Sequence, residues 1–267
     1  MRYLVLTGNH PRHLYYLNGI SDRCNVVGCV LEKQDSIIPT PPKGLDKIDH
    51  ENFVKHFENR QKYEIEYFGS ESVSANYPTH YLENNTNSIR NTVEFIKDIA
   101  PDVIFVFGVL NFIKSIKTSL GYNPLVINLN TGLIQRYNGD ATLFYPFYFL
   151  EPNWAGATFH LINDNLYHEI IHQFVPELER GDTIHEVACK VVEQSVKEVG
   201  IIISYIEGKK KLNVIRKKIN GKLFLGEEFT PQHLRVIYNL FNDDLVDHFL
   251  DKKISSKNPV LIKIKGN

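Results

Sequence analysis

Short apolar runs of strand length recur along the first half of the chain and are separated by longer amphipathic stretches. The runs are rich in β-branched residues and do not alternate strictly between apolar and polar positions, which is typical of parallel strands buried on both faces. They lie at Tyr3–Thr7, Asn25–Leu31, Val103–Phe107 and Leu125–Leu129. Over so few residues a buried helix segment can show the same pattern as a buried strand. The prediction of strands therefore also depends on the helical stretches between these runs.

Two stretches repeat apolar residues three and four positions apart, which is the period of a helix. The first is Asn87–Ile99, and Pro101 lies two residues beyond its end, where proline commonly follows a helix. The second is Thr183–Val199, with Asp182 as its expected N-cap. Strands that alternate with helices predict an α/β fold, here a Rossmann-like, mostly parallel sheet that occupies residues 1–205.

Residues 206–267 show a different pattern. The dipeptide Asn220-Gly221 separates two alternating runs, and this is a strong hairpin signal because both residues tolerate positive φ. Thr230 followed by Pro231 is a favourable N-cap and first helical position. We therefore expect a small C-terminal β-hairpin and helix appendage.

Composition narrows the class of protein. The chain has 267 residues, 43% of them hydrophobic, which is ample for a sizeable core. Its 30 Lys and Arg nearly balance its 31 Asp and Glu, which argues against a general nucleic-acid binder. No stretch approaches the roughly 20 apolar residues that span a bilayer, and the N-terminus lacks the pattern of a signal peptide. We expect a soluble, cytoplasmic protein with no nucleic-acid and no membrane partner.

The chain has three cysteines, Cys24, Cys29 and Cys189. Three cannot all pair within one chain, and no C-x-x-C spacing is present. We interpret them as structural thiols of a protein in a reducing compartment.

Candidate chemistry is sought where predicted strands end, because ligands of open α/β sheets bind outside the carboxyl ends of the strands. Four segments qualify: Gly8–Pro11, Gly108–Asn111, Asn128–Gly132 and the loop near Asp164–Glu169. After the first strand, Asn9, His10 and Arg12 are candidates for binding a substrate, with Arg12 suited to a phosphate. The alternative is a plain loop with a helix cap. No G-x-G-x-x-G is present, so a dinucleotide fingerprint is absent.

Residues 168–172 read HEIIH and fit the zinc motif H-E-x-x-H, which requires a helix. The flanking residues suit a strand at least as well. On a strand His168 and His172 would lie about 13 Å apart at ~3.3 Å per residue, too far to share one ion. We expect no metal site, and a metallohydrolase remains a remote alternative.

Residues 126–164 are the most informative part of the chain. A buried strand ends at Asn128 and a glycine-containing loop follows. The matched positions are Asn128, Gly132, Leu133, Arg136, Tyr137 and Gly139, then Gly156, Thr158 and His160. This order resembles the formyltransferase family that uses 10-formyltetrahydrofolate, whose members include methionyl-tRNA formyltransferase and the sugar N-formyltransferases. The family pattern is N-x-H, a Gly-Leu or Ser-Leu step, R-Y-R-G, and later G-x-T-x-H.

Further segments extend the resemblance over most of the chain. They are HFENRQKYEIEYFG at 56–69, Pro101–Ile104, Val175-Pro176 with Gly181–Thr183, and GKLFLGEEFTP at 221–231. The resemblance implies a formyltransferase that moves a formyl group from 10-formyltetrahydrofolate, as co-substrate, to the amine of a nucleotide-linked amino sugar. A sugar is favoured over tRNA because the short appendage lacks a basic β-barrel to grip RNA. Among relatives the appendage often builds an interface, so a homodimer is expected.

The resemblance also implies particular contacts. The folate would lie against Phe107, Gly108, Val109, Leu110 and Tyr167. The sugar nucleotide would contact Arg136 and Tyr137 in addition to the residues that follow the first strand.

The catalytic positions depart from the family pattern. The family uses an Asn, a His and an Asp, and only the Asn is matched, by Asn128. Asn130 stands at the His position, and the Asp position falls on or beside Tyr167. An Asn amide donates a hydrogen bond but does not titrate near neutral pH. Because Asn128 and Asn130 are two residues apart on an extended segment, we expect both to face one pocket.

Three interpretations follow. The two asparagines can form a double-donor oxyanion hole while another base serves, with His168 preferred, then Asp164 and Glu169. The chain can be an inactive relative that binds folate or a sugar nucleotide. The scaffold can also carry out another reaction on a related substrate.

Overall fold

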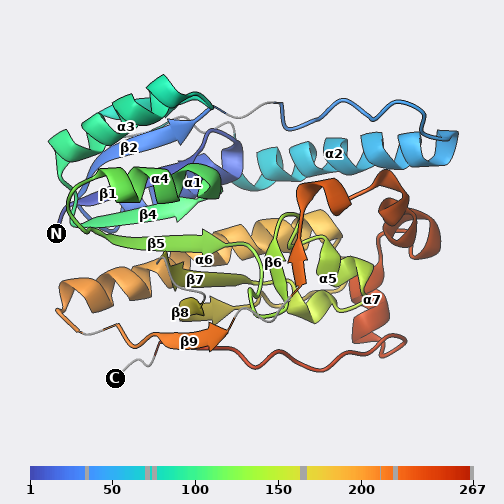
Figure 1. The fold of residues 1–267 in the computed structure, drawn as a ribbon. Helices are drawn as coiled ribbons and strands as arrows, with labels where there is room; N and C mark the ends of the chain where they lie inside the picture. The colour runs from blue at the N-terminus through green and yellow to red at the C-terminus, as the bar shows by residue number, and fades with distance from the viewer. Residues whose placement is uncertain are drawn as a thin grey trace.

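The computed structural model describes residues 1–33, 36–69, 73, 77–162, 167–210, 212–218 and 222–264. Its centre is an eight-stranded sheet with the order β3-β2-β1-β4-β5-β7-β8-β9 (Figure 1). Strands β3 to β5 of this order run parallel, and β7, β8 and β9 continue the sheet antiparallel. The strands are β1 Tyr3–Gly8, β2 Val26–Glu32, β3 Thr79–Leu82, β4 Val103–Phe107, β5 Leu125–Asn130, β7 Ala157–Leu161, β8 Tyr167–Phe174 and β9 Ile215–Lys218. The predicted α/β class and mostly parallel sheet are confirmed.

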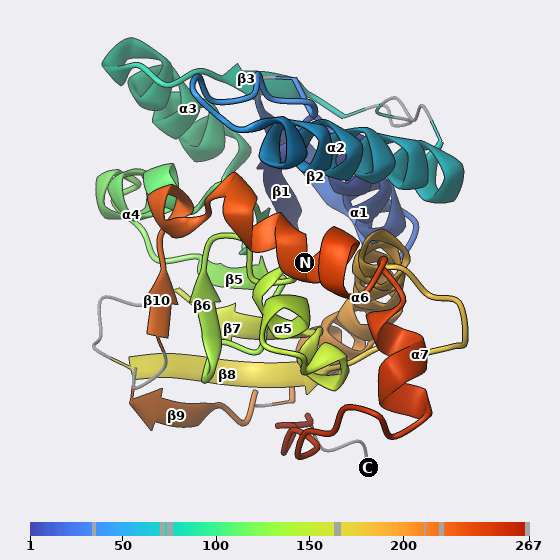
Figure 2. The same cartoon turned by 90° about the vertical axis from the view of Figure 1, so that its right-hand side faces the viewer.

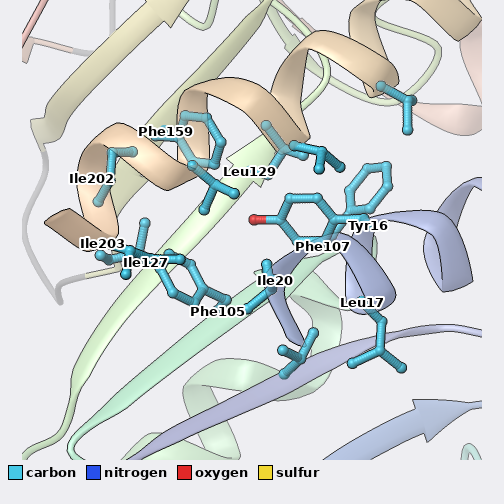
Figure 3. Packing of buried hydrophobic residues seen from close by; sticks show 14 of the residues in the cluster. Tyr16, Leu17, Ile20, Phe105, Phe107, Ile127, Leu129, Phe159, Ile202 and Ile203 are labelled. Atoms are coloured by element: carbon cyan, nitrogen blue, oxygen red, sulfur yellow. The ribbon is translucent and has the colours of Figure 1, made fainter. Parts of the chain in front are cut away.

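Helices cover both faces of this sheet. One face packs against α1 and α6, and the other against α3 and α4. The helices are α1 Pro11–Ser21, α2 Lys47–Phe68, α3 Thr86–Ile99, α4 Leu110–Ser119 and α6 Ile184–Glu207. Figure 3 shows the first interface, where large apolar side chains of β4 and β5 meet those of α1 and α6. In the described part of the chain, no helix is both long and apolar enough to span a bilayer.

A second group of elements gathers at the carboxyl ends of the parallel strands (Figure 2). It comprises β6 Tyr137–Gly139, α5 Tyr145–Tyr148, η1 Pro152–Trp154, β10 Lys222–Phe224, η2 Gly226–Glu228, η3 Pro231–His233, the π-helix η4 Val236–Leu240 and α7 Leu245–Leu250. Their apolar side chains share a core with the start of α6 and with Phe53 of α2. Residues beyond 206 therefore pack onto the earlier chain, and the division at 205/206 stays a prediction.

The predicted helices are present, with one correction at a cap. The first runs from Thr86 to Ile99 and ends at Ala100 in the left-handed region, directly before Pro101. The second begins at Ile184, one residue later than expected from an N-cap at Asp182. Thr183 is its N-cap and forms a capping box with Glu186, since each side chain bonds the other residue's backbone N–H.

The predicted hairpin at Asn220-Gly221 is wrong. Strand β9 pairs antiparallel with β8 in the main sheet, whereas β10 pairs parallel with β6 in a separate two-stranded sheet. The turn itself lies outside the described residues. A lone hairpin is only marginally stable in water. Two open strand edges, together with burial of the Phe224 ring against Tyr137 and Tyr145, offer these segments a better arrangement.

The expected helix start at Thr230 and Pro231 is present, but the helix is short. A 3₁₀ turn begins at Pro231 and leads into the π-helix. The wider π turn places Tyr238 inward, where it is buried.

Asp243 predicts a pH dependence of stability. Its carboxylate accepts a hydrogen bond from the backbone N–H of Ile184 at 3.2 Å, and burial raises its pKa from 3.8 to about 6. The folded state therefore binds this proton more tightly than the unfolded state. The resulting stability is complete below the unfolded pKa near 4 and is lost as pH rises through 6. We expect a loss of roughly 2 kcal/mol between pH 4 and pH 7.

Asp243→Asn keeps a carbonyl oxygen for Ile184 and tolerates the positive φ of 61° at this position. This variant is expected to be more stable than the parent at pH 7 and equally stable near pH 4, as measured by urea unfolding. Asp244→Asn removes a neighbouring, exposed carboxylate and controls for net charge. A variant that is less stable than the parent at pH 7 would contradict the prediction.

Candidate active site

A cavity of about 380 Å³ opens at the carboxyl ends of β4 and β5, within the size range of small-molecule sites. Its walls come from α1, α2, the first turns of α6, and the loops that follow β4, β5 and β6. Apolar rings form one part of the wall, including Phe57, Phe107, Phe144 and Phe229. Polar and charged side chains form another part, and this mixture is expected of a site that both buries and orients a ligand.

Two arginines and one glutamate form a charged cluster in the wall, and Asp140 lines another part of the cavity. Glu64 Oε1 accepts from Arg60 Nε at 3.0 Å and lies 3.2 Å from a terminal nitrogen of Arg12. The Glu64 side chain is only 4% exposed, so its charge is balanced within the protein. Two positive groups against one negative group leave this cluster with a net charge of about +1.

Two atoms of this cluster lack a hydrogen-bond partner among the described residues. They are Arg12 Nε and Glu64 Oε2, and both are buried. Buried polar atoms are rarely left unpaired in folded proteins. The hydrogen bonding of this cluster is therefore incomplete among the described residues.

The Arg60 and Glu64 side chains share one face of α2 with His56. These residues lie four positions apart along the helix, and that spacing stacks side chains on one face. The face is directed at the cavity because α2 packs on α6 and on the C-terminal segment. Figure 1 shows that α2 extends beyond the carboxyl ends of the strands, which brings this face over the site.

A histidine of α2 and a histidine of α6 meet in the same wall. The rings of His56 and His185 lie 4.5 Å apart between centroids, and both contact the hydroxyl of Tyr238. Burial lowers the pKa of His56 to about 3. Burial and the nearby His56 hold the pKa of His185 well below its usual value. Both rings are therefore neutral at pH 7.

The three cysteines are free thiols. Cys189 lies one turn after His185 and also lines the cavity. Burial raises its pKa, and the nearby carboxylate of Glu64 raises it further. The thiol is thus protonated and is a poor nucleophile.

Gly108 is required by the shape of the site. Its φ is +80°, and a Cβ there would lie 2.5 Å from Cε1 of His13. His13 is fixed in turn: Thr7 donates its hydroxyl proton to the Phe107 carbonyl at 3.0 Å, so His13 Nδ1–H donates to Thr7 at 2.9 Å. Burial lowers the pKa of His13, which keeps the ring neutral. The end of β4 is therefore rigid where a ligand would meet it.

The two asparagines of β5 have different surroundings. Asn130 lines the cavity, and its amide donates to the Gly132 carbonyl at 3.3 Å. Asn128 is fully buried, and its amide lies 3.0 Å from Nε2 of His160, its partner across to β7. Asn128 Oδ1 is buried with no partner among the residues that the structure describes. Joint action of the two amides on one group stays a prediction.

Arg136 and Tyr137 lie away from the cavity. Both side chains bond the carboxylate of Glu151 at 2.6 Å, and the Arg136 guanidinium stacks on Trp154. Burial raises the pKa of Tyr137. These contacts hold the loop after β5 against the segment around Glu151 and Trp154 that precedes β7, and a role in substrate binding stays a prediction.

The other predicted site residues are spread around the same edge of the sheet. Phe107, Gly108 and Arg12 line the cavity, and Val109 is buried beside them. Asn9 is exposed and His10 half-buried just before α1. Asp164 lies outside the described residues, as do the side chains of Leu110, Tyr167 and His168.

The HEIIH segment forms part of β8, so the expected strand is confirmed and the helix of a zinc motif is absent. The loop predicted at 164–169 is wrong from Tyr167 onward, because β8 begins at that residue. Glu169 is buried and paired with Arg216 at 2.7 Å. His172 lies 2.8 Å from Glu198 and accepts from the Ile264 N–H. Within the described residues no cluster of His, Cys, Asp and Glu is arranged to hold a metal ion.

Several residues in and behind the cavity wall were not predicted from the sequence. His56, Arg60 and Glu64 belong to the segment 56–69, which was used only as part of the resemblance to the formyltransferase family. Their four-residue spacing is the signal that could have identified them as one face of a helix. His185 and Cys189 repeat this spacing on α6. Tyr238 carried no such signal, because its position depends on how the C-terminal segment folds back.

No protein-family model matches the chain, and no curated protein matches it. Solved structures do. Phosphoribosylglycinamide formyltransferase from Anaplasma phagocytophilum is 14% identical, with 85% of this chain and 98% of that chain covered and a TM-score of 0.52. A 4-N formyltransferase from Francisella tularensis is 16% identical, with 85% and 77% covered and a TM-score of 0.51.

An N-formyltransferase from Helicobacter canadensis, in complex with folinic acid and dTDP-3-aminofucose, is also similar. It is 15% identical, with 97% of this chain and 85% of that chain covered and a TM-score of 0.52. The chain thus has the fold of the formyltransferases, as the sequence pattern predicted.

Proposed function

We propose that the protein is an N-formyltransferase that moves a formyl group from 10-formyltetrahydrofolate to the amine of a nucleotide-linked amino sugar. The observation that carries this proposal is the cavity at the carboxyl ends of β4 and β5, which Gly108 and Asn130 line together. These are the positions at which the sequence resemblance places folate and the reacting carbon. The complex of the Helicobacter canadensis protein, with a folate and a nucleotide-linked amino sugar, supports the same pair of substrates.

The charged wall supports a phosphorylated acceptor. Arg12 and Arg60 are held side by side by Glu64, which lowers the entropic cost of presenting two guanidiniums to one anion. Guanidinium groups bind phosphate oxygens with directed, charge-assisted hydrogen bonds. The sugar nucleotide would place its phosphates here and its sugar toward Asn130.

The residues present fit a folate donor where they are described. The rigid segment after β4, where Phe107 and Gly108 line the cavity, suits a ligand that carries an apolar ring. Phe107, Gly108, Val109, Leu110 and Tyr167 would hold it. The donor supplies a formyl group attached to a nitrogen that leaves during transfer.

Asn128 and Asn130 would stabilise the negative charge that develops on the formyl oxygen. Fixed amide donors aimed at such an oxygen are often the largest contribution to acyl transfer. Neither amide can take the proton that the attacking amine must lose. The base must therefore be another group.

The test is incubation of the protein with 10-formyltetrahydrofolate and a panel of nucleotide-linked amino sugars, followed by mass spectrometry. Gain of one formyl group by an acceptor supports the proposal. Folate binding with no formylated product from any amine supports the alternative of a relative that only binds its ligands, which the altered position of Asn130 favours. Zinc-dependent hydrolysis would support neither.

Arg60→Ala is expected to raise KM for the nucleotide-linked acceptor roughly tenfold while kcat changes little, because a phosphate contact gives uniform binding. Lys62→Ala removes an exposed cation, 63% accessible, from the same helix and is the matched control. Equal effects of the two changes would show that only the overall charge matters.

A further inference from the structure

The wall of the cavity contains a chain of three hydrogen-bonding groups, His56, Tyr238 and His185. His56 Nδ1 lies 2.9 Å from the Tyr238 hydroxyl oxygen, and His185 Nε2 lies 3.2 Å from the same oxygen. They come from α2, the π-helix and α6, so three distant segments converge on one hydroxyl. Tyr238 is 6% exposed and lies behind the two rings, which themselves line the cavity.

The single hydroxyl proton restricts how these groups bond. The Asn59 side chain also hydrogen-bonds the hydroxyl and opposes the rise in the pKa of Tyr238 that burial produces, as a donor to the oxygen does. The hydroxyl can donate to one ring only, and the other ring must then donate to the oxygen. If Tyr238 donates to His56, both rings carry their proton on Nε2. If it donates to His185, both carry it on Nδ1.

The nitrogens not bonded to Tyr238 are His56 Nε2 and His185 Nδ1. The fully buried, unpaired side-chain atoms of the described residues include neither of them. Both rings line the cavity, so these nitrogens are open to it. In the first arrangement His185 Nδ1 accepts and His56 Nε2–H donates, and in the second arrangement the roles are exchanged.

The chain can therefore carry a proton without holding a charge. A proton that enters at one ring displaces the proton of that ring toward Tyr238, Tyr238 passes its own proton to the other ring, and that ring releases one. Burial makes a charged imidazole costly here, as the low pKa of both histidines indicates. A concerted transfer between two neutral arrangements avoids this cost.

We infer that His56, Tyr238 and His185 form the proton relay of the cavity, in which one ring takes the proton that the attacking amine loses and the other protonates the leaving nitrogen. This inference rests on the proposed function. Formyl transfer forms one bond from the amine nitrogen to the formyl carbon and breaks one bond from that carbon to the donor nitrogen. One proton must pass between the two nitrogens, and the relay moves one.

The relay supplies what Asn130 lacks. A titrating residue is absent at that position, yet transfer still requires a proton acceptor within reach of the amine. Two neutral imidazoles with open nitrogens in the same cavity meet this requirement. The nearby Cys189 and Glu64 do not, because the thiol is held protonated and the carboxylate is bound by two guanidiniums.

The arrangement itself is tested by ¹⁵N NMR of the ring nitrogens, with no need for formyl transfer. We expect His56 and His185 to be neutral at pH 7 and to show the same fraction of Nε2 protonation, changing together with temperature. In Tyr238→Phe the two fractions should become independent. A charged ring at pH 7, or one ring protonated on Nε2 while the other is protonated on Nδ1, overturns the relay whatever the protein catalyses.

The kinetic test uses whichever acceptor the parent protein formylates. Tyr238→Phe keeps the ring and removes the bridging oxygen, and it is expected to lower kcat about a hundredfold with little change in KM. Tyr145→Phe is the matched control, because its buried hydroxyl has no partner in the described part of the chain and its ring lies in the same apolar cluster. An unchanged kcat in Tyr238→Phe overturns the relay and leaves the proposed function standing. If the parent protein forms no product, the proposed function fails, and a relay acting in formyl transfer fails with it.

Discussion

Asn128→Ala is expected to lower the turnover of formyl transfer by roughly 10²–10³, with little change in the affinity for the acceptor. The side chain is fully buried two residues before the end of β5, where its amide lies 3.0 Å from His160 and its carbonyl oxygen has no described partner. A group held this firmly needs no reorganisation when charge develops on the formyl oxygen. Its removal therefore affects the transition state more than the bound acceptor, and kcat falls while KM does not.

The control for this change is Asn153→Ala. Asn153 is also buried, but its side chain bonds Ser256, Asn258 and the Lys257 carbonyl in the C-terminal segment. Its loss should lower the midpoint of unfolding and leave kcat unchanged. A similar loss of kcat in both variants would mean that general loosening, and not the deletion of an oxyanion donor, explains the effect of Asn128.

Gly139→Ala is expected to destabilise the fold by about 4 kcal/mol. Gly139 has φ +98°, and a Cβ there would lie 2.2 Å from the carbonyl oxygen of Phe224. That oxygen accepts the Asp140 N–H at 2.8 Å, in register with the pairing of β6 and β10. The methyl group therefore separates the two strands and disturbs the packing of Phe224 between Tyr137 and Tyr145.

Gly121→Ala separates the steric part of this effect from backbone strain. Gly121 has a similar positive φ of 77°, but a Cβ there meets nothing within 4 Å. Only strain remains, which costs about 1 kcal/mol. Chemical unfolding of the two variants should differ by at least about 2 kcal/mol. Equal values would show that the contact between β6 and β10 is not needed for stability.

The strands and main helices could be predicted because their signals are local. Each parallel strand is buried on both faces and must be apolar throughout, and each surface helix repeats apolar residues with the helical period. The N-cap was displaced by one residue because Asp182 and Thr183 are both good caps. The choice falls to Thr183, which alone stands three residues before Glu186, while Asp182 pairs with Lys190.

The C-terminal region could not be predicted in the same way. Two short strands around Asn220-Gly221 favour a hairpin when only neighbouring residues compete for their hydrogen bonds. In the folded chain, β8 and β6 offer edges that are far away in sequence, and β9 and β10 pair with them. Pairing preferences of this kind depend on burial and on available partners more than on local propensity.

The candidate site likewise contains residues that local signals predicted and residues that they did not. Arg12, Gly108 and Asn130 were predicted because they follow strand ends, and all three line one cavity. His56 and His185 were missed because each, taken alone, is an ordinary polar residue of an amphipathic helix. Arg136 contacts Glu151 and Trp154 in the structure, and its expected contact with substrate stays a prediction.

By itself the sequence determined where strands end and therefore where polar loops must gather, since apolar runs have to be buried and the chain must leave the sheet where they stop. It also determined the loss of the titrating side chain at Asn130. Only the tertiary structure decided which distant groups meet at the site. His56 and Tyr238 are 182 positions apart, and their contact depends on α2 and the C-terminal π-helix packing over the same edge of the sheet. No local pattern encodes such a meeting, because it arises from the shape that all the packed elements leave between them.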